Sequence, residues 1–280
     1  MENQTLIRVG LFSVCFLMLL LLEWRSPLVR YREVWTINRF TNMLFLLGTV
    51  GTSRLLISMS AVSAALFAQS NDFGIFNVFP IHAGVSFIIT LILLDFLIYL
   101  QHITMHAVPF LWRFHQIHHA DERLDATTGF RFHPGEIFFS IVYKWLVVFL
   151  IGPSIVAVVV FEIILSSFSL FSHSNSKLLS RYQVILERVF ITPQTHWIHH
   201  SVGVVESQKN FGFCLCLWDR LFKTYTCYTL LEVTRLKFGV ADINAKGNNF
   251  QDMLLHPFRK MHGSNYLLRR WRREIGRAHV

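Results

Sequence analysis

The sequence has little charge and no cysteine framework. Of its 280 residues, only 15% are charged and 53% are hydrophobic. The four cysteines, Cys15, Cys214, Cys216 and Cys227, form no CxxC pair, so neither a disulfide scaffold nor a structural zinc finger is indicated. The apolar residues come in long runs instead of amphipathic stripes, which is not typical of a soluble enzyme.

The basic residues also lack the arrangement that binds nucleic acid. The formal net charge is +9, but the arginines and lysines flank hydrophobic runs and form no stripe with interleaved aromatic residues. We therefore expect no nucleic-acid partner. Loops held on the cytoplasmic side of a membrane would show the same excess of positive charge.

Four apolar regions suggest membrane helices, each of which needs about 20 residues. They cover Leu6 to Leu22, about 43–68, about 78–100 and about 137–172. No small-residue cleavage site follows the first, so we expect a retained anchor and not a signal peptide. The fourth is too long for one crossing and is broken by Gly152-Pro153, which predicts a helical hairpin.

The loops predict the orientation. Residues 25–42 hold Arg25, Arg30, Arg32 and Arg39, whereas the loop 69–77 has no Lys or Arg. The positive-inside rule then places 25–42 in the cytoplasm, and following the chain places 101–136 and 173–280 on the same side. We predict an all-α integral membrane protein with four to five membrane helices, including the hairpin, and a cytoplasmic helical cap.

Three histidine clusters fall on this predicted cytoplasmic side. They are His102 and His106 (HxxxH), then His115, His118 and His119 (HxxHH), then His196, His199 and His200 (HxxHH). These spacings put each cluster on one face of a helix, and Thr192-Pro193 predicts the start of the last helix. Chance gives about 0.03 HxxHH patterns in such a chain, so two of them indicate metal binding by neutral imidazoles.

The ligand type leaves the metal open. All-nitrogen sites suit zinc, copper, iron and nickel. Because a closed structural zinc site takes four ligands, eight or nine histidines imply two metal ions. No HExxH motif occurs, which argues against a zincin. Two alternatives stay open, a membrane metal-binding or transport protein without redox catalysis and a bis-histidine haem cytochrome; histidines that flank the spans count against both.

The order HxxxH, HxxHH, hairpin, HxxHH resembles the fatty acid hydroxylase/sterol desaturase superfamily. The surrounding residues are similar to its bacterial, sterol desaturase-like membrane members in DFLIYLQH (95–102), LWRFHQIHHAD (111–121), TTGFRFHPGE (127–136), FSHSN (171–175) and NFGFCLCLWDRLFKTY (210–225). The resemblance covers about 40–225 and is specific at the level of the superfamily, not of the substrate.

The resemblance implies a non-haem di-iron centre that uses O2 to hydroxylate or desaturate a lipid or sterol-like substrate, or to oxidise an ether bond. Its iron ligands would be His102, His106, His115, His118, His119, His196, His199 and His200, with His173 of the HSN pattern as a ninth. Residues expected to orient these ligands or support them structurally are Asp95, Tyr99, His133, Asn175, Asp219 and Arg220. A separate reductase, ferredoxin or cytochrome is expected to supply electrons, and the expected location is the bacterial inner membrane.

Three regions are expected along the chain. Residues 1–77 would form N-terminal membrane helices and a cytoplasmic loop, 78–225 the hydroxylase-like catalytic domain, and 226–280 a cytoplasmic tail. The last residues, EIGRAHV (274–280), match a common sequencing-adapter stretch when reverse-translated. We therefore expect them to be a sequencing artefact, and resequencing of the locus tests this.

Overall fold

The computed structural model of the chain describes residues 2–31, 37–240, 243 and 249–259. Over these residues the protein is helical, and the only β-pairing consists of three isolated bridges. The predicted all-α fold class is confirmed. The segment expected to be a sequencing artefact, 274–280, lies outside the described residues.

The helices follow the chain in a simple order. They are α1 (Glu2–Arg25), α2 (Ile37–Leu55), η1 (Ile57–Met59), α3 (Ala61–Ser70), α4 (Ile75–Val78), α5 (Ala83–Ala107), α6 (Pro109–His119), η2 (Ala126–Phe130), α7 (Pro134–Ile151), α8 (Ile155–His173), α9 (Ser180–Leu186), α10 (Pro193–His199), η3 (Glu206–Gln208), α11 (Leu217–Leu221), α12 (Leu230–Val233), α14 (Phe250–Leu255) and η4 (His256–Phe258).

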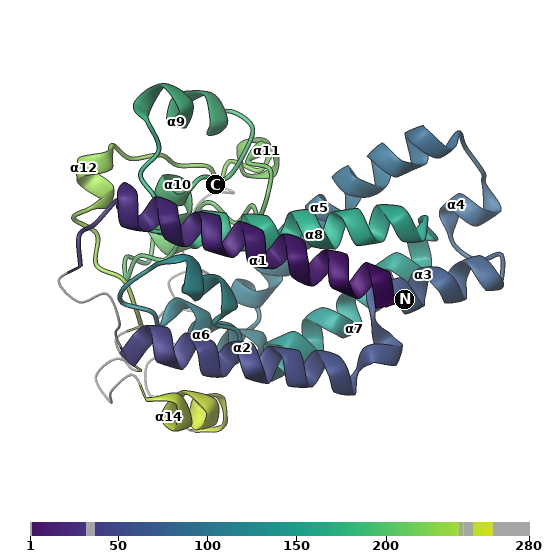
Figure 1. Ribbon diagram of the computed structural model, residues 1–280, viewed down its shortest axis with the longest axis horizontal. Coiled ribbons are helices and arrows are strands. Elements are labelled where there is room, and N and C mark those ends of the chain that lie inside the picture. Colours follow the sequence, from purple (N-terminus) through teal and green to yellow (C-terminus); the bar gives the residue numbers. More distant parts are fainter. Residues whose placement is uncertain (1, 32–36, 241–242, 244–248, 260–280) are drawn as a thin grey trace, which may run out of the picture.

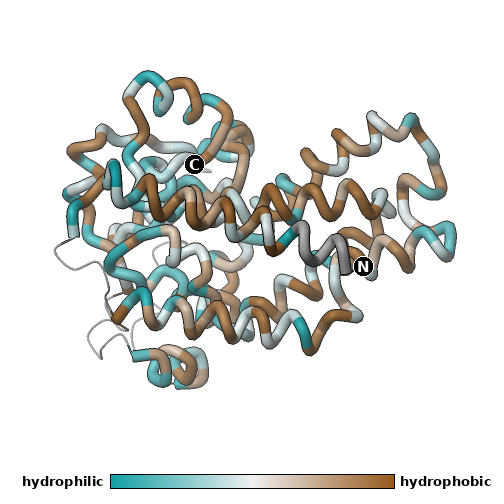
Figure 2. The backbone as a smooth tube through the Cα atoms, in the orientation of Figure 1, coloured by the Kyte–Doolittle hydropathy of each residue, from teal (hydrophilic) through white to brown (hydrophobic). Residues whose placement is uncertain are grey.

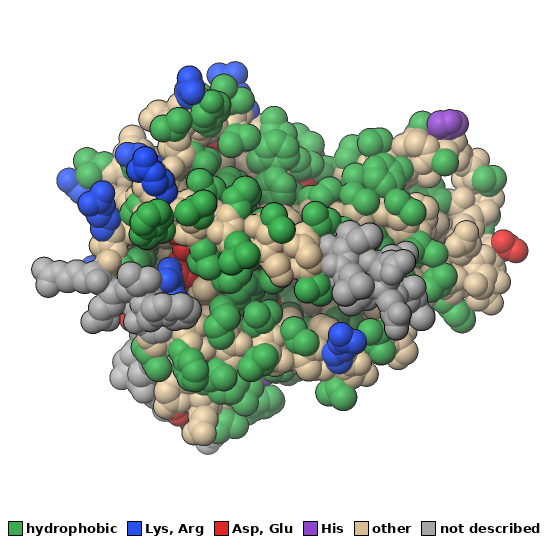
Figure 3. All heavy atoms as spheres, viewed as in Figure 1, with side chains coloured by type: hydrophobic (Ala, Val, Ile, Leu, Met, Phe, Trp, Pro, Cys, Tyr) green, Lys and Arg blue, Asp and Glu red, His purple; other side chains and the backbone are tan. Residues whose placement is uncertain are grey.

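Long and short helices occupy different parts of the molecule. Figure 1 shows α1, α2, α5, α7 and α8 running along the long axis, whereas α6, α9, α10, α11, α12 and α14 gather at one end. The long helices are mainly hydrophobic (Figure 2), and on the face shown in Figure 3 most of the basic side chains lie at the end that holds the short helices. The short helices therefore lie together at one end of an apolar bundle.

Three helices of the described chain are long and apolar enough to cross a membrane, namely α5, α7 and α8. The predicted hairpin is present: α7 ends at Gly152, which adopts a left-handed conformation with φ of 66°, and the Ser154 side chain caps the start of α8. Large apolar side chains such as Leu146, Leu150 and Val156 are exposed on this hairpin. Such a surface suits lipid contact.

The second apolar run departs from the prediction of one membrane helix over about 43–68. The chain instead forms α2 and α3, with the 3₁₀ turn Ile57–Met59 between them. The Ser60 side chain accepts a hydrogen bond from the backbone N–H of Ser63, which begins a new helix after the turn. The total of four to five membrane helices and the region boundaries after residues 77 and 225 remain predictions.

A buried carboxylate ties α1 to the end of the bundle that holds the short helices. The Glu23 side chain accepts hydrogen bonds from the backbone N–H groups of Ala126 (2.6 Å) and Asn175 (2.8 Å). Arg39 of α2 donates to Asp125 (2.6 Å) and lies 3.4 Å from Glu23. These contacts hold the start of η2 and the end of α8 against α1 and α2.

A second buried carboxylate, Asp121, holds the segment that follows α6. It accepts hydrogen bonds from Asn38 (2.8 Å) and Asn42 (2.9 Å) of α2, and from Thr128 of η2 (2.8 Å). Arg131, which is fully buried, donates to Asn42 (2.9 Å) and lies 3.9 Å from Asp121. Because buried charges are costly unless they are paired, this network fixes the segment firmly.

The turn between α7 and α8 generates a stability prediction. A Cβ added to Gly152 would lie 2.8 Å from the carbonyl oxygen of Phe73 and 2.7 Å from Asn77 Nδ2, in a backbone conformation that L-residues avoid. We expect Gly152→Ala to lower the free energy of unfolding by about 1–3 kcal/mol, measured as a lower thermal midpoint of detergent-solubilised protein. The control Gly51→Ala adds a Cβ that meets no atom within 4 Å and should not lower the midpoint. Equal midpoints for both variants would contradict the turn geometry.

Candidate metal centre

Four helices deliver the predicted histidines to one place. His102 and His106 lie in the last turns of α5, and His115, His118 and His119 in α6. His196 and His199 lie in α10, which His200 caps at its C-terminal end. His173, the last residue of α8, joins them. The chain starts α10 as predicted, with Pro193 in the first turn and the side chains of Thr192 and Thr195 capping it reciprocally.

All nine histidines are buried and form two groups. In each group, one ring nitrogen of every member lies within 4.8 Å of the others. The groups are, first, His102, His106, His115, His119 and His199, and, second, His118, His173, His196 and His200. The structure therefore gathers every histidine that the sequence nominated as a metal ligand.

Each HxxHH box is divided between the two groups, which corrects the expectation that a box points in one direction. In α6, His115 and His119 face the group of five and His118 faces the group of four. In α10 the division is reversed, since His199 faces the group of five while His196 and His200 face the group of four. Spacing i, i+4 selects the pair, and the residue between them turns toward the neighbouring group.

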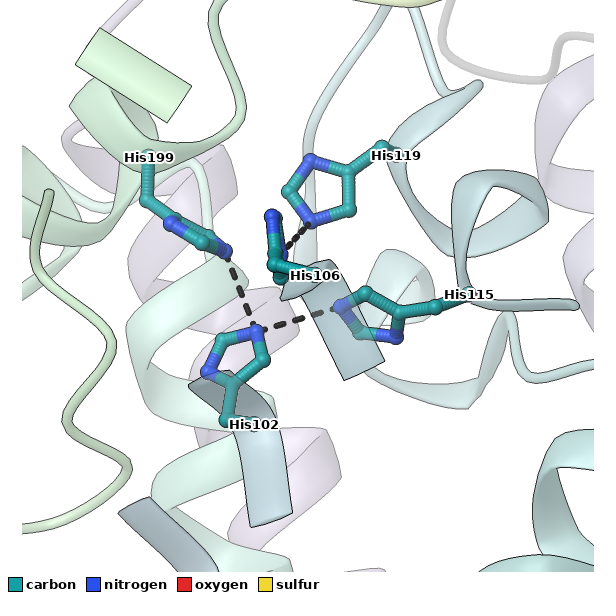
Figure 4. A group of neighbouring side chains, drawn as sticks. All are labelled: His102, His106, His115, His119 and His199. Atoms are coloured by element: carbon teal, nitrogen blue, oxygen red, sulfur yellow. Dashed lines mark hydrogen bonds between the residues drawn. The ribbon is translucent and has the colours of Figure 1, made fainter. Parts of the chain in front are cut away.

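The Nε2 atoms converge within the group of five (Figure 4). His102 Nε2 lies 3.1 Å from Nε2 of His115 and 3.1 Å from Nε2 of His199, and the Nε2 atoms of His106 and His119 are also 3.1 Å apart. These rings come from α5, α6 and α10, so three helices meet at this point.

One ring organises the group of four. His173 Nε2 lies 3.0 Å from Nε2 of His118, 3.1 Å from Nε2 of His196 and 3.1 Å from Nε2 of His200. Because one lone pair on His173 Nε2 accepts one hydrogen bond, at most one of these three rings can donate to it.

The opposite ring nitrogens show which tautomers are present. The Nδ1–H groups of His102 and His199 donate to the backbone carbonyls of Phe211 and Lys209, each at 2.8 Å, and that of His173 donates to Ser169 O at 2.6 Å. A carbonyl oxygen only accepts hydrogen bonds, so the proton lies on Nδ1 and Nε2 carries a lone pair. The lone pairs of His102 and His199 therefore face each other at 3.1 Å.

This arrangement fits a metal ion and is unfavourable without a cation. Two imidazole nitrogens bound to one transition metal at about 2.0–2.1 Å lie about 2.9–3.4 Å apart for angles between octahedral and tetrahedral. The Nε2 separations of 3.0–3.1 Å fall in this range. The Nδ1 atoms of His118, His196 and His200 are buried without a hydrogen-bond partner among the described residues.

Burial keeps the imidazoles in the state that binds metals. It lowers the pKa of His118, His119, His196 and His200 well below the usual value, and that of His199 to about 3. Repulsion between neighbouring imidazoles adds to this effect. Neutral imidazole is the form that ligates metals.

Glu136 is a residue of the site that sequence reasoning did not nominate. Its Oε1 accepts a hydrogen bond from Nδ1–H of His115 at 2.7 Å, which leaves Nε2 of that ring free to bind a metal. The carboxylate is buried in the first turn of α7, and its Oε2 has no hydrogen-bond partner among the described residues. An acidic residue at the start of a long apolar helix was the available signal.

Asp219, one of the predicted supporting residues, acts one step away from a histidine. Its two carboxylate oxygens accept hydrogen bonds from the backbone N–H groups of Phe211 and Gly212, both at 2.8 Å. Because the carbonyl of Phe211 accepts from His102, Asp219 fixes the segment that orients this ring.

Asp95 and Tyr99 support the same segment and do not hydrogen-bond to His102, contrary to one expectation. Asp95 accepts a hydrogen bond from Trp218 Nε1 at 2.8 Å, and the Tyr99 hydroxyl lies 3.0 Å from Thr224 Oγ1. Both residues therefore anchor the 211–224 segment to α5.

The other three supporting candidates lie in the frame around the site. His133 caps the start of α7 through Gly135 N (2.9 Å), and its Nε2–H donates to Leu254 O at 3.0 Å. The Asn175 side chain bonds to the backbone of Val29. Arg220 donates to Glu187 O at 2.8 Å and stacks over Tyr225. None of these hydrogen-bond or stacking partners is a histidine of the two groups.

Comparison with known proteins gives the context of this site. The sequence profile of the fatty acid hydroxylase family matches residues 87–224, a range that includes all nine histidines and Glu136. Residues 87–224 therefore form a fatty acid hydroxylase domain. The resemblance that the histidine pattern indicated is thereby confirmed.

Relatives of this hydroxylase domain occur in bacteria and animals. The chain is 28% identical over 171 residues to the ornithine lipid hydroxylase OlsE of Rhizobium tropici, covering 61% of this chain and 50% of OlsE. It is 31% identical over 137 residues to alkylglycerol monooxygenase of Xenopus tropicalis, and 29% identical over 131 residues to that of Homo sapiens. These two matches cover 49% and 47% of this chain but only 30% and 28% of the monooxygenases. No solved structure gives a significant match.

The contact between Glu136 and His115 predicts an effect on metal affinity. We expect Glu136→Gln to weaken metal binding by about 10–100-fold, because the amide orients the ring less firmly and lowers its basicity. Titration of metal-free, full-length protein with Fe²⁺ under anaerobic conditions measures this. The control Glu187→Gln changes a carboxylate that bonds to Gln183 and should leave the affinity unchanged. Equal affinities for wild type and Glu136→Gln would show that the contact does not support the site.

The lowered pKa values predict a pH dependence of the metal-free protein. The histidines whose pKa burial lowers stay neutral when folded, whereas in the unfolded chain they take up protons below about pH 6.5. Stability is therefore complete above about pH 6.5 and declines as the pH falls, down to about pH 3 for His199. Each histidine kept neutral costs about 1.4 kcal/mol per pH unit. The thermal midpoint should be equal at pH 7.5 and 8.5 and clearly lower at pH 5.5; a constant midpoint down to pH 5.5 would be the contrary result.

Proposed function

We propose that the protein is a membrane-bound oxygenase that hydroxylates a lipid or sterol-like substrate with O2 and electrons from a separate donor. The observation that carries this proposal is the pair of buried histidine groups, whose Nε2 lone pairs converge at 3.0–3.1 Å inside a fatty acid hydroxylase domain. The relatives, a lipid hydroxylase and alkylglycerol monooxygenases, support hydroxylation over desaturation.

Each histidine group would hold one iron ion. The family favours iron among the metals that suit nitrogen ligands. When bound, a pair of irons would supply the activation of O2 that attack on an unactivated C–H bond requires. The group of five would hold one ion through α5, α6 and α10, and the group of four would hold the other through α6, α8 and α10.

The residues of the chain would position both ions and keep water away. Backbone carbonyls and Glu136 orient three of the imidazoles of the group of five, and burial excludes solvent from both groups. A cavity of about 250 Å³ lies beside His102 and His115 and is lined mainly by apolar side chains of the long helices. A lipid chain entering between these helices would reach the histidines from the bilayer.

We further propose that the site faces the cytoplasm of a bacterial cell and that the protein lies in the inner membrane. The positive residues around the junction of α1 and α2, including Arg25, Arg30 and Arg39, support this orientation. The histidines lie at the end of the bundle where the short helices gather, so a reductase, ferredoxin or cytochrome would deliver electrons at that end.

Substitution of one histidine tests the function. We expect His199→Ala to lose the hydroxylated lipid completely and to bind less iron than wild type, because it removes a ligand that faces the Nε2 of His102. The measurements are iron content and optical spectrum of the purified protein, and lipidomics of cells with and without the gene. His82→Ala is the matched control, since His82 is exposed and lies at the opposite end of α5.

The same experiment separates the alternative functions. Iron in both groups without a Soret band supports the oxygenase. Stoichiometric zinc or copper with an unchanged lipid profile would favour a metal-binding or transport protein, and a Soret band would favour a cytochrome. A wild-type product from His199→Ala would contradict the proposed site.

A further inference from the structure

Helix α7 carries a polar stripe on an otherwise apolar surface. Glu136, Ser140 and Lys144 are spaced four residues apart, so they lie along one face of the helix. All three line the cavity of about 250 Å³ that reaches His102 and His115. A charged residue eleven residues into a helix of membrane-crossing length is costly and marks a functional position.

Lys144 also lines a second, larger cavity of about 420 Å³. The two cavities share the side chains of Phe12, Lys144, Leu165 and Ser166, so they are neighbouring parts of one hollow between α1, α7 and α8. One end of this hollow therefore reaches the histidines, and Lys144 stands where the two parts meet. The combined space is within the range of about 300–1,000 Å³ that ligand sites occupy.

The ionisable residues of the larger cavity carry two positive charges and one negative charge. Arg8, Lys144 and Glu162 line it. Arg8 and Glu162 form an ion pair with each other, whereas the Lys144 ammonium has no hydrogen-bond or ion-pair partner among the described residues. A ligand with one negative charge would balance the cavity and provide an acceptor for the ammonium.

We propose that this hollow binds a single-chain amphiphile and that Lys144 recognises its anionic end group, a carboxylate or a phosphate. The part beside His102 has only about 250 Å³, which favours one acyl chain over two. The apolar residues Phe12, Ile98 and Phe213 line that part and suit a hydrocarbon chain.

The position of attack follows if the proposed oxygenase function holds, on which this step rests. Glu136, which contacts His115, lies eight residues before Lys144, a distance of about 12 Å along the helix axis. The oxidised carbon would then be in the interior of the chain, several carbons from the anionic group.

Binding measurements test the recognition without requiring catalysis. Full-length protein in nanodiscs of neutral phosphatidylcholine is titrated with oleate, with oleoyl lysophosphatidate and with oleyl alcohol, which shares the chain but has no charge. We expect wild type to bind at least one of the anions about tenfold more tightly than the alcohol. The anion that binds more tightly identifies carboxylate or phosphate as the preferred group.

Variants assign the preference to Lys144. Lys144→Met should abolish the preference and Lys144→Arg should retain it. Arg54→Met removes an exposed cation that lines neither cavity and should leave the preference unchanged. Glu162→Gln removes the negative partner of Arg8 and should increase the preference, which tests the charge balance even if Lys144→Met fails to fold.

The outcomes separate this inference from the proposed function. Equal binding of the anions and the alcohol by wild type, or a preference that survives in Lys144→Met, would overturn the inference even if a lipid is hydroxylated. A preference that depends on Lys144 would support it even if no oxidised product is found. In that second case the oxygenase function would fail alone.

Discussion

The burial of nine imidazoles, among which His102 and His199 turn facing lone pairs toward each other, is the constraint on which the rest of this structure depends. Lone pairs 3.1 Å apart repel, and the backbone acceptors of His102 and His199 prevent a proton from moving between them. Only a cation makes such an arrangement favourable. Each HxxHH box contributes to both groups, so α6 and α10 must both be in place for either group to form.

The surrounding fold holds the histidines in position through different hydrogen bonds on its two sides. On one side, Asp121 and Glu23 collect hydrogen bonds from α2, η2 and the end of α8, and thereby hold the residues next to His119 and His173. On the other side, Asp219 fixes the course of the 211–224 segment, and Asp95 holds that segment against α5. The apolar helices provide length and a lipid-compatible surface, while a few buried carboxylates fix the positions of the segments around the histidines.

Sequence pattern predicted the hairpin and eight of the nine histidines, because these depend on local spacing, and the resemblance to the superfamily added His173. It did not predict how the boxes divide, since that depends on how α6 and α10 face each other. Glu136 and Lys144 were missed because each is a single charged residue in or beside an apolar run. The break between α2 and α3 was missed because the apolar run continues across it. Ser60, which caps the start of α3, marks the break.

The acceptors of His102 and His199 have a consequence for how the protein can vary. They are main-chain carbonyls, of Phe211 and Lys209, and no point substitution deletes a carbonyl oxygen. The Lys209 side chain is therefore free to change as long as the backbone keeps its course, whereas the buried Phe211 ring also packs against His102, His106 and His199. These two hydrogen bonds are sensitive instead to Asp219, which holds the course of that backbone without touching a histidine itself.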